Sequence, residues 1–108
     1  NEAMDKVEAI IIANRYIETI SKKYQIERVF LFGSFAKGNY HADSDIDLAI
    51  VLYDAEDIID TQIDLLCLRS DEDLMIEPHP FLKNDFKLSN PLVAEIIKTG
   101  IEILNHAA

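Results

Sequence analysis

Apolar and polar residues follow one another along this chain in patterns that predict both helices and strands. Between residues 4 and 24 the apolar residues recur at spacings of three, four and seven, which predicts an amphipathic helix. Two apolar runs follow, at 29–32 and 45–52, and their branched and aromatic side chains favour strands. Residues 25–28 are expected to form a short connection. The first half of the chain therefore predicts a helix and then two strands.

The link between these strands, residues 33–44, is short and contains a turn bounded by glycines. Gly33 ends the first strand, Ser34 is a natural helix N-cap, and one helical turn fits before Gly38. A parallel crossover needs about a dozen residues or more, so this link is at the lower limit. We therefore expect a mixed sheet.

The second half of the chain predicts two more helices and two more strands. Asp54 is placed to cap a helix, and Asn90 with Pro91 is a typical helix start. Pro78 has no amide hydrogen for a ladder, so its strand either lies at a sheet edge or ends there. The expected elements are helices over 55–69 and 91–99 and strands over 74–80 and 101–104, with 81–88 ambiguous. This order predicts an α/β domain, with a small mixed sheet and helices packed on one side.

Composition and charge limit the class of protein. The 108 residues suit a single domain over 1–108, in which residues 1–3, ahead of Met4, are read as an expression remnant. The formal net charge of −10 argues against direct nucleic-acid binding, because Lys and Arg supply most of that affinity. It indicates either a basic partner surface or solubility alone. The single cysteine, Cys67, is expected in the core and suits a reducing compartment. With no secretory signal and no run of ~18 apolar residues, we expect a cytoplasmic protein without a membrane partner.

Two aspartates, Asp45 and Asp47, occupy an apolar strand in which aspartate is uncommon. Residues two apart in a strand point to the same face, and a rise of ~3.3 Å per residue separates their stems by roughly 7 Å. Carboxylates so placed suit two Mg²⁺ ions, which clamp the oxygens of an in-line phosphoryl displacement. The simpler alternative is a solvated strand end. We predict that both aspartates bind metal.

The glycine turn suits a phosphate. Gly33 lets the backbone approach a ligand closely, and the helical turn that follows presents free amide hydrogens. The Ser34 hydroxyl can add a hydrogen bond, and Lys37 can reach an outer phosphate as a point charge. The alternatives are an ordinary strand-to-helix turn and, for Lys37, a surface charge. We predict a triphosphate cradle about a dozen residues before the aspartate pair.

A third carboxylate is expected on a neighbouring strand. Glu77 shares its predicted strand face with Met75 and His79, and we predict that it binds metal and orients or deprotonates an acceptor hydroxyl. Asp73 is the rival, although it falls in the polar turn before the strand. The alternative role for Glu77 is an edge charge that prevents aggregation. His79 is either structural or in contact with substrate.

These residues match the pattern of a known family. The chain resembles the DNA polymerase beta-type nucleotidyltransferases, whose G-S-x-A-x-G…S-D-x-D-L motif corresponds here to Gly33-Ser34-Phe35-Ala36-Lys37-Gly38 and Ser44-Asp45-Ile46-Asp47-Leu48. The resemblance extends over nearly all of the chain and is closest to the minimal branch, which has only the catalytic core. It implies a polymerase beta-like fold, two Mg²⁺ ions bound by Asp45, Asp47 and a third acidic residue, and a nucleotide site at Gly33, Ser34, Lys37 and Ser44.

The resemblance also implies an activity and a partner. Minimal nucleotidyltransferases usually act with a small helical HEPN-domain protein as a toxin–antitoxin pair. By this resemblance the chain is the antitoxin and transfers AMP from Mg-ATP to a tyrosine of the toxic ribonuclease. Two positions depart from the family pattern: many members carry Arg where this chain has Lys37, and many carry Asp where it has Glu77.

Other functions stay open. The chain could act as a non-catalytic antitoxin or regulatory binding module with a vestigial nucleotide site. Transfer to a small molecule is less suited to so short a chain, which leaves little room for an acceptor-binding domain. An active-site cleft shared across a homodimer would restore that possibility.

Overall fold

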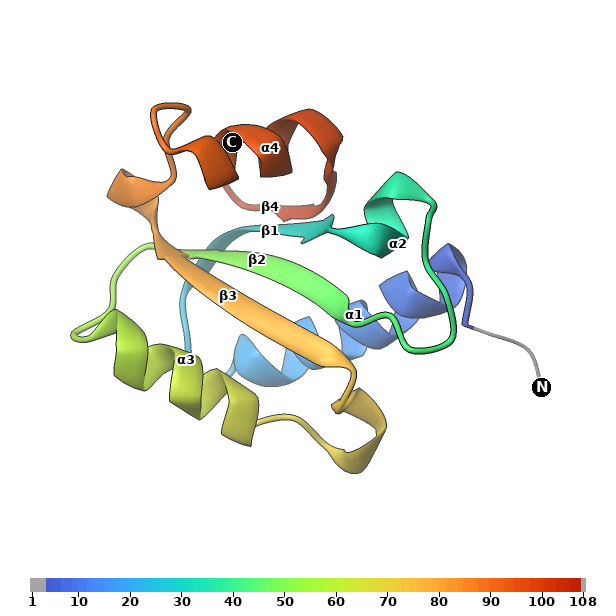
Figure 1. Ribbon diagram of the computed structural model, residues 1–108. Helices are drawn as coiled ribbons and strands as arrows, with labels where there is room; N and C mark the ends of the chain where they lie inside the picture. The colour runs from blue at the N-terminus through green and yellow to red at the C-terminus, as the bar shows by residue number, and fades with distance from the viewer. Residues whose placement is uncertain (1–3, 108) are drawn as a thin grey trace.

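The computed structural model describes residues 4–107 and builds them around one four-stranded sheet (Figure 1). The strands are β1 (Ile26–Phe32), β2 (Ile46–Leu52), β3 (Ile76–Leu82) and β4 (Ile101–Asn105), in the order β3-β2-β1-β4. Strand β1 runs antiparallel to both β2 and β4, and β2 runs parallel to β3. The sheet is therefore mixed, as the short link between the first two strands predicts. The proposed expression remnant, residues 1–3, lies outside the described residues.

The helices cover both faces of the sheet. They are α1 (Lys6–Ile20), α2 (Ser34–Lys37), α3 (Ile58–Cys67) and α4 (Pro91–Thr99), with short 3₁₀ turns η1 (Asp71–Asp73) and η2 (Lys83–Asp85). Figure 1 shows α1 and α3 on one face and α4 on the other. The expectation that helices pack on one side holds for α1 and α3 and is wrong for α4. No helix among residues 4–107 has the length and apolar character needed to cross a membrane.

Helix α4 lies on the second face because that face carries aromatic residues that need cover. Phe30 and Ala49 are buried there against Ile96 of α4, with Phe81 and Phe86 at the margin. The helix begins and ends as its sequence predicts, since the Asn90 side chain accepts hydrogen bonds from two amides of its first turn and Gly100 follows its last residue. This small second core holds α4 against β1.

The larger core lies under α1. The alternate residues of β1 and β2 that point to this face are fully buried, and they pack with the inner side of the helix. Tyr16 is also fully buried, and its hydroxyl donates to the carbonyl oxygen of Leu65 in α3 at 2.5 Å. Burial raises the pKa of this phenol well above its ordinary range. The hydrogen bond therefore ties α1 to α3 beneath the sheet.

Strand β1 begins three residues earlier than the apolar run indicates, because charged side chains in its first half are paired. Glu27 is buried, and its carboxylate lies 3.4 Å from Lys83 Nζ. Arg28 donates from Nε to Glu102 of β4 at 2.6 Å, and its guanidinium lies over the Phe30 ring. The expectation of a connection is therefore wrong for residues 26–28, since polar residues without visible partners look like a loop.

Helix α3 is shorter than expected at its start. Its N-cap is Asp57 and not Asp54, and the Asp57 carboxylate accepts hydrogen bonds from the amides of Ile59 and Asp60 at 2.9 and 3.0 Å. The helix packs through Thr61 and Leu65. Several aspartates in succession offer alternative caps, and the sequence alone does not rank them.

The side chains of α3 contradict one expectation about the core. Cys67 is a free thiol and is exposed, so its assignment to the core is wrong. Ile59 and Ile63 are also exposed, at 67% and 55%. The physical reason is position: α3 lies chiefly against β3, at the edge of the sheet, and one narrow side of the helix is enough to cover it.

Strand β3 is an edge strand, as Pro78 predicts. It runs through Leu82, so the ambiguous segment after residue 80 begins as strand. The amide of Ile46 donates to the Met75 carbonyl at 2.8 Å, and this register turns the nitrogens of Pro78 and Pro80 to the open side. The free edge therefore lacks two amide donors that another chain could pair with.

Candidate functional site

The predicted site lies where β1 ends and β2 begins. Phe32, the last residue of β1, is the antiparallel partner of Asp47, the second residue of β2. Gly33 and α2 follow Phe32 directly, and α2 ends at Gly38, whose φ of +84° lies in the left-handed region. The antiparallel pairing thus brings the glycine turn and the aspartate pair together, although the chain between them passes through an exposed loop.

Gly33 has two reasons to be glycine. Its φ and ψ of 74° and −150° fall in a region that is almost restricted to glycine. A Cβ built on it would lie only 2.4 Å from Asp47 Oδ2. The sequence predicts that this glycine admits a ligand; in the structure the group that approaches its α-carbon is the Asp47 carboxylate.

The two aspartates differ in their surroundings. Asp45 directly precedes β2 and is exposed, whereas the Asp47 side chain is 28% exposed. Ile46 and Leu48 alternate with them and are fully buried in the larger core. The Asp47 carboxylate therefore faces away from the α1 side and is held against the turn, whereas Asp45 is exposed to solvent just before the strand.

Strand β3 supplies the groups beside Asp47. In the parallel ladder Glu77 is the partner of Asp47, and His79 is the partner of Ala49. Residues paired in register point to the same face, so Glu77 lies on the face of Asp47 and is half-buried. His79 Nε2 lies 3.3 Å from Asp47 Oδ1. Alternation along the predicted strand places His79 on the same face as Glu77. Its contact with Asp47 depends on the pairing of β2 with β3, which the sequence alone does not reveal.

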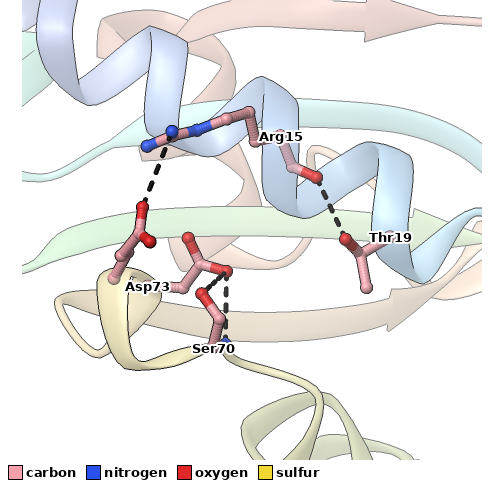
Figure 2. Close-up of polar contacts among 5 residues, drawn as sticks. Arg15, Thr19, Ser70 and Asp73 are labelled. Carbon is pink, nitrogen blue, oxygen red and sulfur yellow. Dashed lines mark hydrogen bonds and ion pairs between the residues drawn. The ribbon is translucent and has the colours of Figure 1, made fainter.

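Asp73, the rival third carboxylate, has a structural role in the polar turn. It is buried, and its Oδ2 accepts hydrogen bonds from the Ser70 hydroxyl at 2.9 Å and the Ser70 amide at 3.3 Å. Figure 2 shows this capping arrangement facing Arg15 and Thr19 of α1. The Asp73 oxygen is thus occupied at the start of η1, whereas Glu77 is in register with Asp47.

Two predicted nucleotide-binding residues already have partners in the structure. Lys37 Nζ lies 3.2 Å from Glu95 Oε2 of α4, with both side chains about half exposed. Ser44 is 6% exposed, and its Oγ accepts the amide hydrogen of His41 at 2.8 Å. Ser44 therefore shapes the loop that delivers Asp45. The proposed contacts of both residues with nucleotide stay predictions.

A family comparison identifies this arrangement. The model of the family described as "Polymerase beta, Nucleotidyltransferase" matches residues 14–107, a span that includes the glycine turn, both aspartates and all of β3. The chain belongs to the polymerase beta nucleotidyltransferase family. Its fold, a small mixed α/β sheet with helices, is the polymerase beta-like fold of that family.

Relatives of this nucleotidyltransferase are consistent with the assignment. It is 30% identical over 97 residues to the Methanocaldococcus jannaschii protein named "Putative protein adenylyltransferase MJ0141", covering 90% of this chain and 88% of that protein. Among solved structures it resembles a "putative nucleotidyltransferase" from Sulfolobus solfataricus, with a TM-score of 0.67, 17% identity and coverage of 98% and 92%. It also resembles a chain of a toxin–antitoxin structure with AMP-PNP, with a TM-score of 0.64, 19% identity and coverage of 91% and 74%. The two structural likenesses support the fold alone.

The donor set of this nucleotidyltransferase fits a hard cation. Carboxylate oxygens are the protein ligands that Mg²⁺ takes, and it uses few of them, adding water and substrate phosphates. Within residues 4–107 no three Asp, Glu, His or Cys side chains converge closely enough to enclose an ion. Asp47 has one oxygen against Gly33, where a Cβ would fill the space, and Asp45 is exposed beside it. This is an open pair of carboxylates and not a closed cage.

A cavity of this nucleotidyltransferase lies elsewhere. It measures about 400 Å³ and is lined by Ser21, Tyr24, Gln25, Ile26, Tyr53 and His106. Ile26 starts β1 whereas Gly33 follows its end, so the cavity is at the opposite end of the sheet from the aspartates. None of the predicted site residues lines this cavity, so we do not assign it as the catalytic site.

Proposed function

We propose that this nucleotidyltransferase transfers AMP from Mg-ATP to a tyrosine hydroxyl of a partner protein, and that the partner is a HEPN-domain toxin for which this chain is the antitoxin. The observation that carries the proposal is the junction of Gly33, Asp47 and Asp45 at one end of β1 and β2. The family supports nucleotidyl transfer, and the name of the M. jannaschii relative supports a protein acceptor. The pairing is suggested by the fold that this chain shares with chains of toxin–antitoxin structures.

Each residue has a defined task in this proposal. Asp45 and Asp47 hold Mg²⁺, with Glu77 contributing from the neighbouring strand. Gly33 and Ser34 hold the triphosphate through the turn, and Lys37 contacts an outer phosphate once it leaves Glu95. Bound Mg²⁺ would supply charge stabilisation for the attacking and leaving oxygens.

The proposed transfer balances without a further reactant. The tyrosine oxygen forms a bond to the α-phosphorus of ATP, and the bond from that phosphorus to the bridging oxygen breaks. Pyrophosphate leaves with the electron pair. Glu77 accepts the phenolic proton as a general base, a task that requires it to lie within hydrogen-bond reach of the acceptor oxygen.

Labelled ATP tests the proposal directly. The native chain, ATP labelled at the α-phosphate and Mg²⁺ are added to a lysate of the source organism, and a parallel reaction uses label at the γ-phosphate. We expect α-label, and no γ-label, on a second polypeptide whose mass has increased by one AMP. Asp47→Asn is expected to keep the fold and abolish the label. Full activity of that variant, with unchanged metal dependence, would remove the proposal.

A matched control comes from the same loop. Asp43 is exposed, and among residues 4–107 its side chain makes no hydrogen bond, whereas its amide donates to His41 Nδ1. Asp43→Asn removes the same charge as Asp47→Asn and lies close to it in sequence. We expect Asp43→Asn to transfer AMP at the native rate. An equal loss in both variants would show that net charge, and not the Asp47 carboxylate, is responsible.

One observation favours the alternative of a non-catalytic antitoxin. Lys37, a predicted phosphate ligand, is paired with Glu95. Under that alternative the chain neutralises its partner by binding alone. The discriminating measurement is growth rescue of cells that express the partner: rescue by Asp47→Asn as strong as rescue by the native chain favours binding, whereas loss of rescue favours AMP transfer.

A further inference from the structure

Both oxygens of the Asp47 carboxylate are restrained. Oδ2 lies against the α-carbon of Gly33, so close that a Cβ would be 2.4 Å away. Oδ1 lies 3.3 Å from His79 Nε2. A carboxylate oxygen accepts, so the imidazole donates from Nε2. The turn therefore limits the carboxylate on one side and the histidine of β3 limits it on the other.

The fold places His79 for this contact. Its partner in the parallel ladder is Ala49, which is fully buried and carries only a methyl group. The imidazole lies on the Asp47 side, and its ring meets the Phe32 ring edge-on with centroids 5.1 Å apart. Phe32 is itself the antiparallel partner of Asp47. Three adjacent strands thus contribute one residue each to a small cluster of Phe32, Asp47 and His79.

We propose that His79 is a positioning residue that fixes the orientation of the Asp47 carboxylate through the Nε2–H···Oδ1 hydrogen bond. The bond uses one lone-pair direction of Oδ1 and leaves the others for a cation. Its consequence for metal binding rests on the proposed function, whereas the orientation itself does not. Groups that hold a ligating carboxylate typically change metal affinity by about 10–100-fold when they are lost.

A purely structural role makes a different prediction. If His79 only packs against Phe32, then any side chain of similar bulk will replace it. If it acts through the hydrogen bond, a donor near the position of Nε2 is required. His79→Leu keeps bulk and removes the donor, while His79→Gln places an amide donor at a similar distance from the backbone. Comparison of these two variants separates packing from positioning.

The first experiment uses the metal-free protein. Crystal structures of the native chain, His79→Leu and His79→Gln report the position of the Asp47 carboxylate directly. We expect the Asp47 carboxylate to have one orientation in the native chain and in His79→Gln. In His79→Leu we expect it to be rotated or to occupy two conformers. An Asp47 carboxylate that keeps its orientation in His79→Leu would overturn the proposal, whatever the activity of the protein.

The second experiment measures Mn²⁺ binding by the loss of the free-ion electron paramagnetic resonance signal. We expect His79→Leu to raise the Kd about tenfold, and His79→Gln to return it to within about twofold of the native value. His106→Leu, which removes an imidazole from the opposite end of the sheet, is the control and should not change it. Equal Kd values for the native chain and His79→Leu would contradict positioning of a metal ligand.

The two proposals can fail separately. If Asp47→Asn binds Mn²⁺ as tightly as the native chain, then the metal site of the proposed function is wrong. The crystal structure of His79→Leu still decides the positioning role in that case. If Asp47→Asn loses Mn²⁺ and both histidine variants bind it normally, the metal site of the proposed function stands and the inferred effect of His79 on metal affinity is wrong.

Discussion

The carboxylate of Asp47 occupies the space beside Gly33 that any other residue would fill with its Cβ, which would lie 2.4 Å from Oδ2. Gly33→Ala therefore introduces a clash as well as an unfavourable backbone conformation. We expect it to lower the free energy of unfolding by about 1–3 kcal/mol from the backbone alone. Displacement of Asp47 is expected to reduce AMP transfer by about 100-fold, since errors near 1 Å at a reacting centre have this effect.

Gly38→Ala is the matched control for Gly33→Ala. Gly38 also has a positive φ, of +84°, but a Cβ there meets no atom within 4 Å in the part of the chain that the structure describes. We expect a loss of about 1–2 kcal/mol in urea unfolding with transfer unchanged at saturating ATP. Equal losses of transfer in the two variants would show that the conformation of the turn, and not the space kept for Asp47, is what activity requires.

Asp73 and Glu77 are predicted to respond differently to substitution. Asp73→Ala removes the acceptor of two Ser70 hydrogen bonds and is expected to cost about 1 kcal/mol of stability while transfer persists. Glu77→Gln is expected to have the same urea midpoint as the native chain. It should transfer AMP about 100-fold more slowly, because a general base is lost. Urea titration and labelled-ATP transfer check both. The assignment of the third carboxylate is wrong if the losses are reversed.

The ion pair between Lys37 and Glu95 predicts opposite effects on ATP binding. Lys37→Met removes a charged contact with phosphate and is expected to raise the Kd for ATP about tenfold. Glu95→Gln releases Lys37 from its partner and is expected to lower that Kd. Both side chains are about half exposed, so the free energy of unfolding of each variant should lie within about 1 kcal/mol of that of the native chain. Isothermal titration with a non-hydrolysable ATP analogue measures both, and an unchanged Kd in Lys37→Met would assign the lysine to α4 contact alone.

The parts of the site that were predictable are those encoded in one short stretch. Gly33 and Asp47 are separated by a turn and a loop, and the antiparallel pairing of the two strands is enough to bring them together. The edge position of β3 was predictable in the same way, because proline has no amide hydrogen to donate to a neighbouring strand and Pro78 therefore indicates an edge. Local rules predict such features because each of them depends on the residue itself and on its neighbours in the sequence.

The contacts that were missed join residues distant in sequence. His79 meets Asp47, and Lys37 meets Glu95, only after the strands have paired and α4 has folded over the second face. Burial of Glu27 was hidden for a related reason, because its cation partner Lys83 comes from η2. A polar residue in a sequence does not reveal its partner, so charged strand ends look like loops and paired lysines look free.

Tyr24 and Asp64 predict a pH dependence of stability at high pH. The Tyr24 hydroxyl donates to Asp64, which also lies 2.8 Å from Lys23 Nζ. Burial and then this hydrogen bond raise the pKa of Tyr24 from 10.0 to about 12. The same contacts, with that from Lys23 the largest, lower the pKa of Asp64. At pH 8 the Asp64 carboxylate is therefore charged and the Tyr24 phenol is neutral.

The sign of the Tyr24 effect follows from its raised pKa in the folded state. Its contribution to stability is fully present below pH 10.0 and is lost as the pH rises toward about 12, because the unfolded chain releases the proton first. Tyr24→Phe should therefore be less stable than the native chain at pH 8, and the difference should shrink between pH 10 and 12. Urea midpoints across this range measure the difference, and the native-minus-variant absorbance of tyrosinate isolates Tyr24. A difference spectrum that titrates at pH 10 would show that the hydrogen bond to Asp64 does not hold the phenol neutral.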